Sequence, residues 1–286
     1  MRFTRQSQKI TLQLIGLLPR TPYDRLLEVC AGTGTAALLA RTWGARRVWA
    51  CDITARAKHY AQFNAALNGM DHFTALAGNL YEPVKELQFD RIVAHPPYVP
   101  QQSERAMIFR DGGTDGEQVT ARIIQGAASH LAPGGALYLL TYGTDREDSP
   151  YEQRIRAWLG PEQEEFDLLL YEDVAGSPAE VLSRIPIHHR VLDWRNFVET
   201  HRITGIFYGL VVIQRRAAPR RVFNLCRSDL PLASHESLPA LLALNYLYRA
   251  TRISRAFEEC HAATSRGPGN RFHPSHLRRR TASDGY

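Results

Sequence analysis

Cysteine is scarce in this chain of 286 residues, which contains only four. They lie far apart, with no Cys-x-x-Cys pair and no histidine cluster, at Cys30, Cys51, Cys226 and Cys260. Disulfide-held domains and zinc sites need paired or closely spaced ligands. The sequence therefore argues against a disulfide scaffold, predicts no metal site, and is typical of a protein from a reducing compartment.

Long hydrophobic runs are also missing. No stretch reaches the roughly 18 uninterrupted apolar residues that identify a membrane-spanning helix. The apolar patch at residues 12–18 is short for a signal peptide and lacks a small-x-small cleavage site. We therefore expect a cytoplasmic protein with no membrane partner.

The positive charge of the chain is concentrated at one end. The formal net charge is +6, and residues 261–286 carry four of these charges, because they hold five arginines and a single aspartate. A basic tail can bind nucleic-acid phosphates, but such a run is more often a solvated, disordered end. With the body close to neutral, charge is weak support for an RNA partner.

Strand-like and helix-like patterns alternate along the first two thirds of the chain. The buried-strand patterns lie at residues 25–30, 47–52, 74–77, 89–94, 136–141 and 166–171. This alternation predicts an α/β fold with a parallel sheet covered on both faces by helices. A long apolar strand is expected at residues 203–215 and one further strand at 221–226.

The expected organisation has three parts. Residues 1–226 form the main domain, in which 174–203 are an insertion near the active site. Residues 227–260 form a helical extension, and 261–286 a disordered basic tail. The apolar stripe of the extension fits docking on the sheet better than a dimer interface, so no oligomer is supported.

A glycine-rich turn follows the first strand. The run from Gly32 through Gly34 to Ala37 matches the GxGxxA nicotinamide fingerprint, with Asp52 placed for ribose hydroxyls, and it also fits a tight connection without ligand. Glu28 at the end of the first strand is not needed by a dinucleotide fold, whereas its carboxylate suits a cationic amino-acid group. A nicotinamide enzyme also has no need for the double proline at residues 96–97. A nicotinamide-dependent oxidoreductase is therefore the weaker alternative.

Several motifs stand in a fixed order: LLEVCAGTGTAAL, VWACD, GNLYEPV and FDRIVAHPPYVP, then RDGGTDGEQ and LAPGGALYLLTYG. In this order the sequence resembles the class I S-adenosylmethionine-dependent methyltransferases of the Asn-Pro-Pro-Tyr type. Within them it looks closest to the release-factor glutamine methyltransferases and related small-domain families. The resemblance covers residues 24–143. It implies a doubly wound, mostly parallel seven-stranded sheet and S-adenosylmethionine as the cofactor.

The resemblance also assigns cofactor-binding residues. The methionine side of the cofactor would be lined by Glu28, Cys30, Gly32 and Gly34. Asp52 would accept from both ribose hydroxyls. Asn79 stands where an acid usually contacts the adenine amine, and Leu80 would offer a backbone N–H to the ring. Cys30 departs from the family pattern, because it replaces the first glycine of the turn.

The resemblance assigns the catalytic turn to residues 95–98. In the resembled enzymes an asparagine oxygen and the carbonyl of the first proline bind the two hydrogens of a planar amide, and an aromatic residue stacks on it. Here these positions are His95, Pro96 and Tyr98. Two interpretations of His95 stay open: a base for an alcohol, phenol, amine or heterocycle, or a simple acceptor on a nitrogen substrate. A third is that the change marks lost catalysis.

The substrate stays open at this point. The leading hypothesis is methyl transfer to a nitrogen or oxygen of a small molecule or protein side chain. The alternatives are an RNA base N-methyltransferase and a non-catalytic methyltransferase-like scaffold. The resembled family carries a helical domain before its cofactor domain, and only about two dozen residues precede the first strand here, which argues against release factor as the substrate.

Two segments are candidates for substrate recognition. One is the insertion, where aromatic and cationic side chains either clamp a nucleobase or anion or form a cap with a buried core: His188, His189, Arg190, Trp194, Arg195, Phe197, His201 and Arg202. The other is the loop at residues 110–113, which either closes over substrate or uses its glycines only as turn residues.

Overall fold

The computed structural model describes residues 23–100, 107–179, 191–218 and 224–226, together with Leu18, Arg20 and Val222. All of them lie in the first of two compact units, Met1–Pro239, and the second unit is Ala240–Tyr286. Two predicted features lie outside the described residues: the extension at 227–260 and the basic tail at 261–286.

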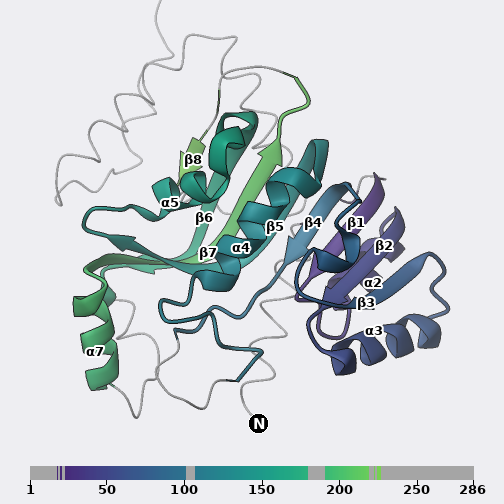
Figure 1. Cartoon of the computed structure of the whole chain (residues 1–286), viewed down its shortest axis with the longest axis horizontal. Helices are drawn as coiled ribbons and strands as arrows, with labels where there is room; N and C mark the ends of the chain where they lie inside the picture. Colours follow the sequence, from purple (N-terminus) through teal and green to yellow (C-terminus); the bar gives the residue numbers. More distant parts are fainter. Residues whose placement is uncertain are drawn as a thin grey trace, which may run out of the picture. The chain divides into compact units, whose positions relative to one another are not determined.

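The described unit is built on one eight-stranded sheet, with the strand order β3-β2-β1-β4-β5-β7-β6-β8 (Figure 1). The strands are β1 (Tyr23–Val29), β2 (Ala45–Asp52), β3 (Phe73–Ala77), β4 (Phe89–Ala94), β5 (Leu131–Arg146), β6 (Phe166–Gly176), β7 (Ile203–Arg215) and β8 (Asn224–Cys226). Strands β3, β2, β1, β4 and β5 are parallel, and β7 runs antiparallel to both β5 and β6. The predicted mostly parallel seven-stranded sheet is confirmed, and β8 adds a short eighth strand where one was expected.

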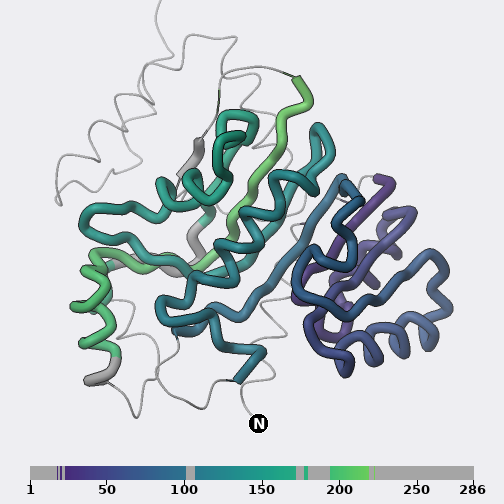
Figure 2. Tube along the Cα trace, in the orientation of Figure 1, coloured from purple at the N-terminus to yellow at the C-terminus, as the bar shows by residue number. Residues whose placement is uncertain are grey.

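Helices lie between the strands along the chain. They are α2 (Thr35–Thr42), α3 (Ala55–Leu67), α4 (Gln118–His130), α5 (Tyr151–Trp158) and α7 (Val191–Thr200), with short 3-10 turns η1 (Glu82–Val84) and η2 (Gly160–Glu165). Figure 1 shows α4 and α5 lying over β5 and its neighbours, and Figure 2 follows the chain through the same elements. No helix in the described part of the chain is long and apolar enough to cross a membrane.

The sheet is buried on both faces. The adjacent residues Leu26 and Leu27 of β1 point to opposite faces, and both are fully buried. On one face, apolar side chains of β1, β4, β5 and β7 pack against α4 and α5, in a cluster that includes Ile92, Ile123 and Ile155. Burial on both faces explains why these strands are continuous apolar runs in the sequence.

Two boundaries differ from the predictions. The strand expected at 136–141 extends over Leu131–Arg146, because Leu131 pairs with Phe89 of β4 and β7 pairs with the other end as far as Arg146. The insertion expected at 174–203 is shorter, because residues 174–176 continue β6 and pair with β7. What remains of it in the described residues is mainly α7.

Candidate functional site

Strand register brings the predicted site residues to one edge of the sheet. Val29 of β1 pairs with Cys51 of β2 on one side and with Ala94 of β4 on the other. The glycine turn, Asp52 and the His-Pro-Pro-Tyr turn, which follow these residues, therefore begin side by side at the carboxyl ends of parallel strands. This edge is where open α/β sheets bind ligands.

The glycine turn has a left-handed backbone at Cys30, Gly32 and Gly34, with φ of +56°, +54° and +74°. At Gly34, the residue before α2, an added Cβ would lie 3.0 Å from the Phe73 ring and 3.1 Å from the Ala61 side chain. This position therefore requires glycine for both its backbone and its packing. Cys30 adopts a left-handed conformation that glycine favours. Burial raises the pKa of its thiol to about 12, so the thiol stays protonated.

Asp52 fastens this turn to the start of α3. Its Oδ2 accepts a hydrogen bond from the backbone N–H of Gly32 at 2.9 Å. Its Oδ1 accepts from both the backbone N–H and the hydroxyl of Thr54, each at 3.0 Å. A carboxylate has about four lone-pair directions, so Asp52 keeps room for about one more donor. Its predicted bonds to two ribose hydroxyls stay a prediction, and they require one donor to be shared or displaced.

The sequence did not reveal how Glu28 is bound. Its carboxylate is 7% exposed and accepts hydrogen bonds from the backbone N–H groups of Ala37 at 2.8 Å and Ala36 at 3.3 Å, in the first turn of α2. Burial raises its pKa to about 7, with a smaller contribution from the charge of Asp52. Glu28 thus anchors the N-terminus of the helix, and its predicted contact with a cationic amino-acid group stays a prediction.

Asn79 and Leu80 lie in the turn after β3. The turn is joined to the end of β2, because the backbone N–H of Gly78 donates to the carbonyl of Asp52 at 2.9 Å. The side-chain nitrogen of Asn79 donates to Glu82 at 3.4 Å, so its amide oxygen remains as the predicted acceptor. Leu80 has a left-handed backbone with φ of +53°, a strained conformation that often marks functional turns.

The His-Pro-Pro-Tyr turn is formed as expected after β4. The His95 and Tyr98 rings stack with centroids 5.7 Å apart and planes inclined by 24°, and Pro96 is buried. Burial lowers the pKa of His95 to about 4, so its imidazole is neutral at physiological pH. A neutral imidazole can accept a hydrogen bond, but a group with this pKa is a weak base near pH 7.

Tyr98 packs against an apolar cluster that includes side chains of α7. Phe197 is buried in this cluster with Tyr142, while Trp194 and Tyr208 pack against it. The interpretation of Phe197 as a core residue is therefore confirmed. Of the described cations in the insertion, Arg195 is largely exposed, and Arg202 binds Glu147 and Asp148 at the surface. His188, His189 and Arg190 lie outside the described residues.

The loop at residues 107–117 packs closely on the His-Pro-Pro-Tyr turn. A Cβ at Gly112 would lie 2.8 Å from the Tyr98 Cα, and one at Gly116 would lie 2.6 Å from the Tyr98 carbonyl oxygen. The loop is thus closely packed on the turn, and its closure over substrate stays a prediction.

A buried ionic network at the same edge was not predicted. Glu117, before α4, accepts hydrogen bonds from the Arg154 guanidinium at 2.7 Å and the Thr144 hydroxyl at 2.8 Å. Arg146 pairs with Asp115 at 2.8 Å. The network joins α4, α5 and the end of β5, and its members lie too far apart in the sequence for a local pattern to reveal them.

In the described part of the chain, no group of histidine, cysteine, aspartate and glutamate residues is placed to hold a metal ion. The strand order, the glycine turn and the acid at the end of β2 together define the class I methyltransferase fold. Residues 7–163 match the family described as "Methyltransferase small domain", and the chain belongs to this family.

Relatives of known name are similar over part of their length. The chain is 32% identical over 161 residues to the ribosomal protein uL3 glutamine methyltransferase of Bradyrhizobium diazoefficiens, covering 52% of this chain and 50% of that protein. It is 35% identical over 155 residues to the release factor glutamine methyltransferase of Moorella thermoacetica, covering 50% and 54%. The chain thus spans about half the length of the curated relatives it matches. The solved ribosomal protein L11 methylase of Lactobacillus delbrueckii subsp. bulgaricus is 21% identical with a TM-score of 0.43, covering 74% of this chain and 79% of that one.

Proposed function

We propose that this protein uses S-adenosylmethionine to methylate an amide nitrogen of a protein side chain. The observation that carries the proposal is the strand register, which brings the Asp52-bound glycine turn beside the turn that holds His95 and Tyr98. The named relatives, which act on ribosomal protein uL3 and release factors, support a protein substrate. Such a partner also favours a place in the cytoplasm.

The residues at the sheet edge fit the cofactor. S-adenosylmethionine would supply an electrophilic methyl group on a positively charged sulfur and would leave as the neutral thioether S-adenosylhomocysteine, while the methylated amide nitrogen would lose one proton to solvent. Asp52 would bind the ribose, and Asn79 and Leu80 would bind the adenine. Ile53, which sequence reasoning missed, directly follows Asp52 and is 57% exposed. A large apolar side chain open to solvent at this point suits one face of the adenine ring.

His95 would act as a hydrogen-bond acceptor. Its neutral imidazole can take one N–H of the acceptor amide, and the carbonyl of Pro96 can take the other. The two bonds would fix the plane of the amide and direct its nitrogen toward the methyl group. Tyr98, stacked beside His95, would cover the amide and exclude water. The low pKa of His95 favours this interpretation over a base that removes a proton from an alcohol or phenol.

The activity test uses S-adenosylmethionine with a labelled methyl group and three separate acceptors: purified uL3, a purified release factor and bulk ribosomal RNA. The proposal expects label in one of the proteins, on glutamine, and none in RNA. Label in RNA that disappears at high salt or without residues 261–286 would favour the RNA base methyltransferase. Cofactor binding without transfer to any acceptor would favour the scaffold.

A further inference from the structure

Three consecutive large apolar side chains are exposed next to the candidate site. Met107, Ile108 and Phe109 are 47%, 59% and 72% exposed. Single exposed apolar residues are ordinary at protein surfaces, whereas contiguous ones mark binding surfaces. We call residues 107–109 the apolar tip.

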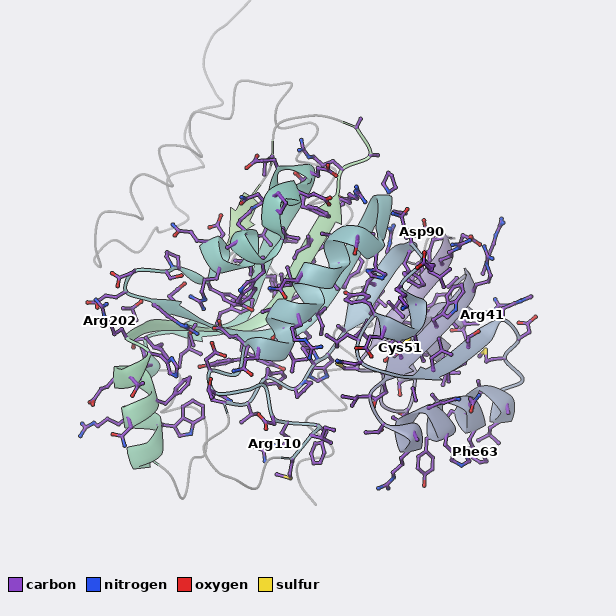
Figure 3. The ribbon with its side chains drawn as sticks, in the orientation of Figure 1. Arg41, Cys51, Phe63, Asp90, Arg110 and Arg202 are labelled. Carbon is purple, nitrogen blue, oxygen red and sulfur yellow. The ribbon has the colours of Figure 1, made fainter. Side chains whose placement is uncertain are left out.

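The apolar tip is tied to the His-Pro-Pro-Tyr turn by its backbone. The N–H of Val99 donates to the carbonyl of Arg110 at 2.8 Å, and the N–H of Gly112 donates to the carbonyl of Val99 at 2.9 Å. Within the loop, the N–H groups of Arg110 and Asp111 both donate to the carbonyl of Met107, at 2.7 and 2.9 Å. The tip is therefore a hydrogen-bonded turn in a fixed relation to the catalytic turn. Figure 3 shows Arg110 on this loop, where it extends away from the strands.

We propose that the apolar tip docks an apolar surface of the protein that carries the acceptor side chain. This inference rests on the proposed function. Val99 follows Tyr98 directly and bridges to Asp111, two residues from Phe109. The N–H of Val99 also donates to the carbonyl of Arg110, the residue after Phe109. With about 5 Å across the bonded pair and about 3.8 Å per residue, the tip begins within roughly 10 Å of Val99. A polypeptide that inserts one side chain beside Tyr98 must pass within this distance, so its neighbouring side chains reach the tip.

The tip would make the enzyme prefer a protein acceptor over a free amide. An apolar contact away from the reacting atoms adds binding energy that only a macromolecule can provide. Clustered aromatic and aliphatic side chains dominate the affinity of protein interfaces. A small amide would meet the same His95 and Tyr98 but would not touch the tip.

The test compares two multiple-serine variants. The tip variant carries Met107→Ser, Ile108→Ser and Phe109→Ser. The control carries Phe63→Ser and Leu67→Ser on α3, which are also exposed, at 56% and 72%. Figure 3 places Phe63 on α3, away from the Arg110 loop. Each variant is assayed with labelled S-adenosylmethionine on uL3, on a release factor and on free N-acetylglutaminamide, and its cofactor affinity and melting temperature are measured.

We expect the tip variant to lose at least about tenfold in kcat/KM for whichever protein the wild type labels. Its cofactor Kd, melting temperature and activity on the free amide should match those of the wild type, and the control variant should match in every assay. Unchanged kcat/KM for the protein, or an equal loss for protein and free amide, would overturn the docking role. A concentration-dependent dimer that only the tip variant loses would assign the surface to a second copy and overturn it too. If the wild type binds cofactor but labels neither protein, the proposed function fails and the docking role falls with it.

Discussion

The Oδ2 atom of Asp52 accepts a hydrogen bond from the backbone N–H of Gly32 at 2.9 Å, across the gap between β2 and the glycine turn. The same carboxylate accepts two hydrogen bonds from Thr54. One side chain thus sets the position of the turn relative to the start of α3. The turn is already positioned before any ligand binds. Binding therefore costs little free energy for ordering the turn.

Cys30 has a left-handed backbone. The effect of a substitution at this position on stability should therefore depend on how easily the new residue adopts a positive φ. Cys30→Val places a β-branched residue at positive φ and should lower the free energy of unfolding by ~2 kcal/mol or more. Cys30→Gly relieves the strain and should change it by less than ~1 kcal/mol. Chemical denaturation measures both, with Cys51→Val in the buried strand β2 as a mild control. A valine variant as stable as the glycine variant would contradict the strained geometry.

Glu28 should make stability fall as pH rises. Its folded pKa of about 7 lies above the ordinary value of 4.5, so between these pH values the folded state binds more protons than the unfolded state. The free energy of unfolding should therefore decrease from about pH 4.5 to about pH 7 and then level off, by as much as ~3 kcal/mol from this group. Glu28→Gln should remove this part of the slope. Urea denaturation from pH 5 to pH 8 tests it, and parallel curves for the two proteins would refute the raised pKa.

His95 should give no pH dependence of its own near neutrality. Its pKa is lowered to about 4 by burial, so the imidazole stays neutral from pH 6 to pH 9. We expect His95→Asn to retain methyl transfer within about tenfold, because asparagine also accepts a hydrogen bond. The ratio of wild-type to variant kcat/KM should be constant over this range. A ratio that rises with pH to a plateau would instead assign His95 as a base.

Two buried tyrosines allow the contribution of a hydroxyl to stability to be compared with and without a hydrogen bond. The Tyr142 hydroxyl is buried and has no hydrogen-bond partner among the described residues, whereas the Tyr81 hydroxyl donates to the carbonyl of Ile123 at 2.9 Å. Tyr142→Phe should leave the free energy of unfolding unchanged or raise it by up to ~1 kcal/mol. Tyr81→Phe should lower it by ~1–2 kcal/mol. Equal losses in thermal or chemical unfolding would show that the Tyr142 hydroxyl has a partner.

The sequence predicted the parts of the fold that depend on local patterns. β4 and β7 lie where their apolar runs indicated. Thr54, a residue type that favours helix starts, caps α3 by accepting from the Ala57 N–H. β5 was predicted ten residues too short. Its C-terminal end is extended by pairing with β7 across roughly sixty residues of chain. Its N-terminal end is extended by the pairing of Leu131 with Phe89 of β4. No local pattern at Pro133 or Arg146 reveals either extension.

The candidate site was also only partly predictable from the sequence. Its residue types and their order along the chain were predictable, and strand register brought them to one edge as expected. The contacts that set their chemistry were not. The bonds of Glu28 to α2, the burial of His95 and the Glu117 network depend on side-chain positions in the folded protein.

The measurement that tests the central claim most directly is a calorimetric titration with S-adenosylmethionine, S-adenosylhomocysteine and NAD. The wild type should bind both adenosyl ligands with a Kd on the order of micromolar and should not bind NAD. Asp52→Ala, shown by circular dichroism to be folded, should lose this binding. A folded wild type that binds neither adenosyl ligand would contradict the account.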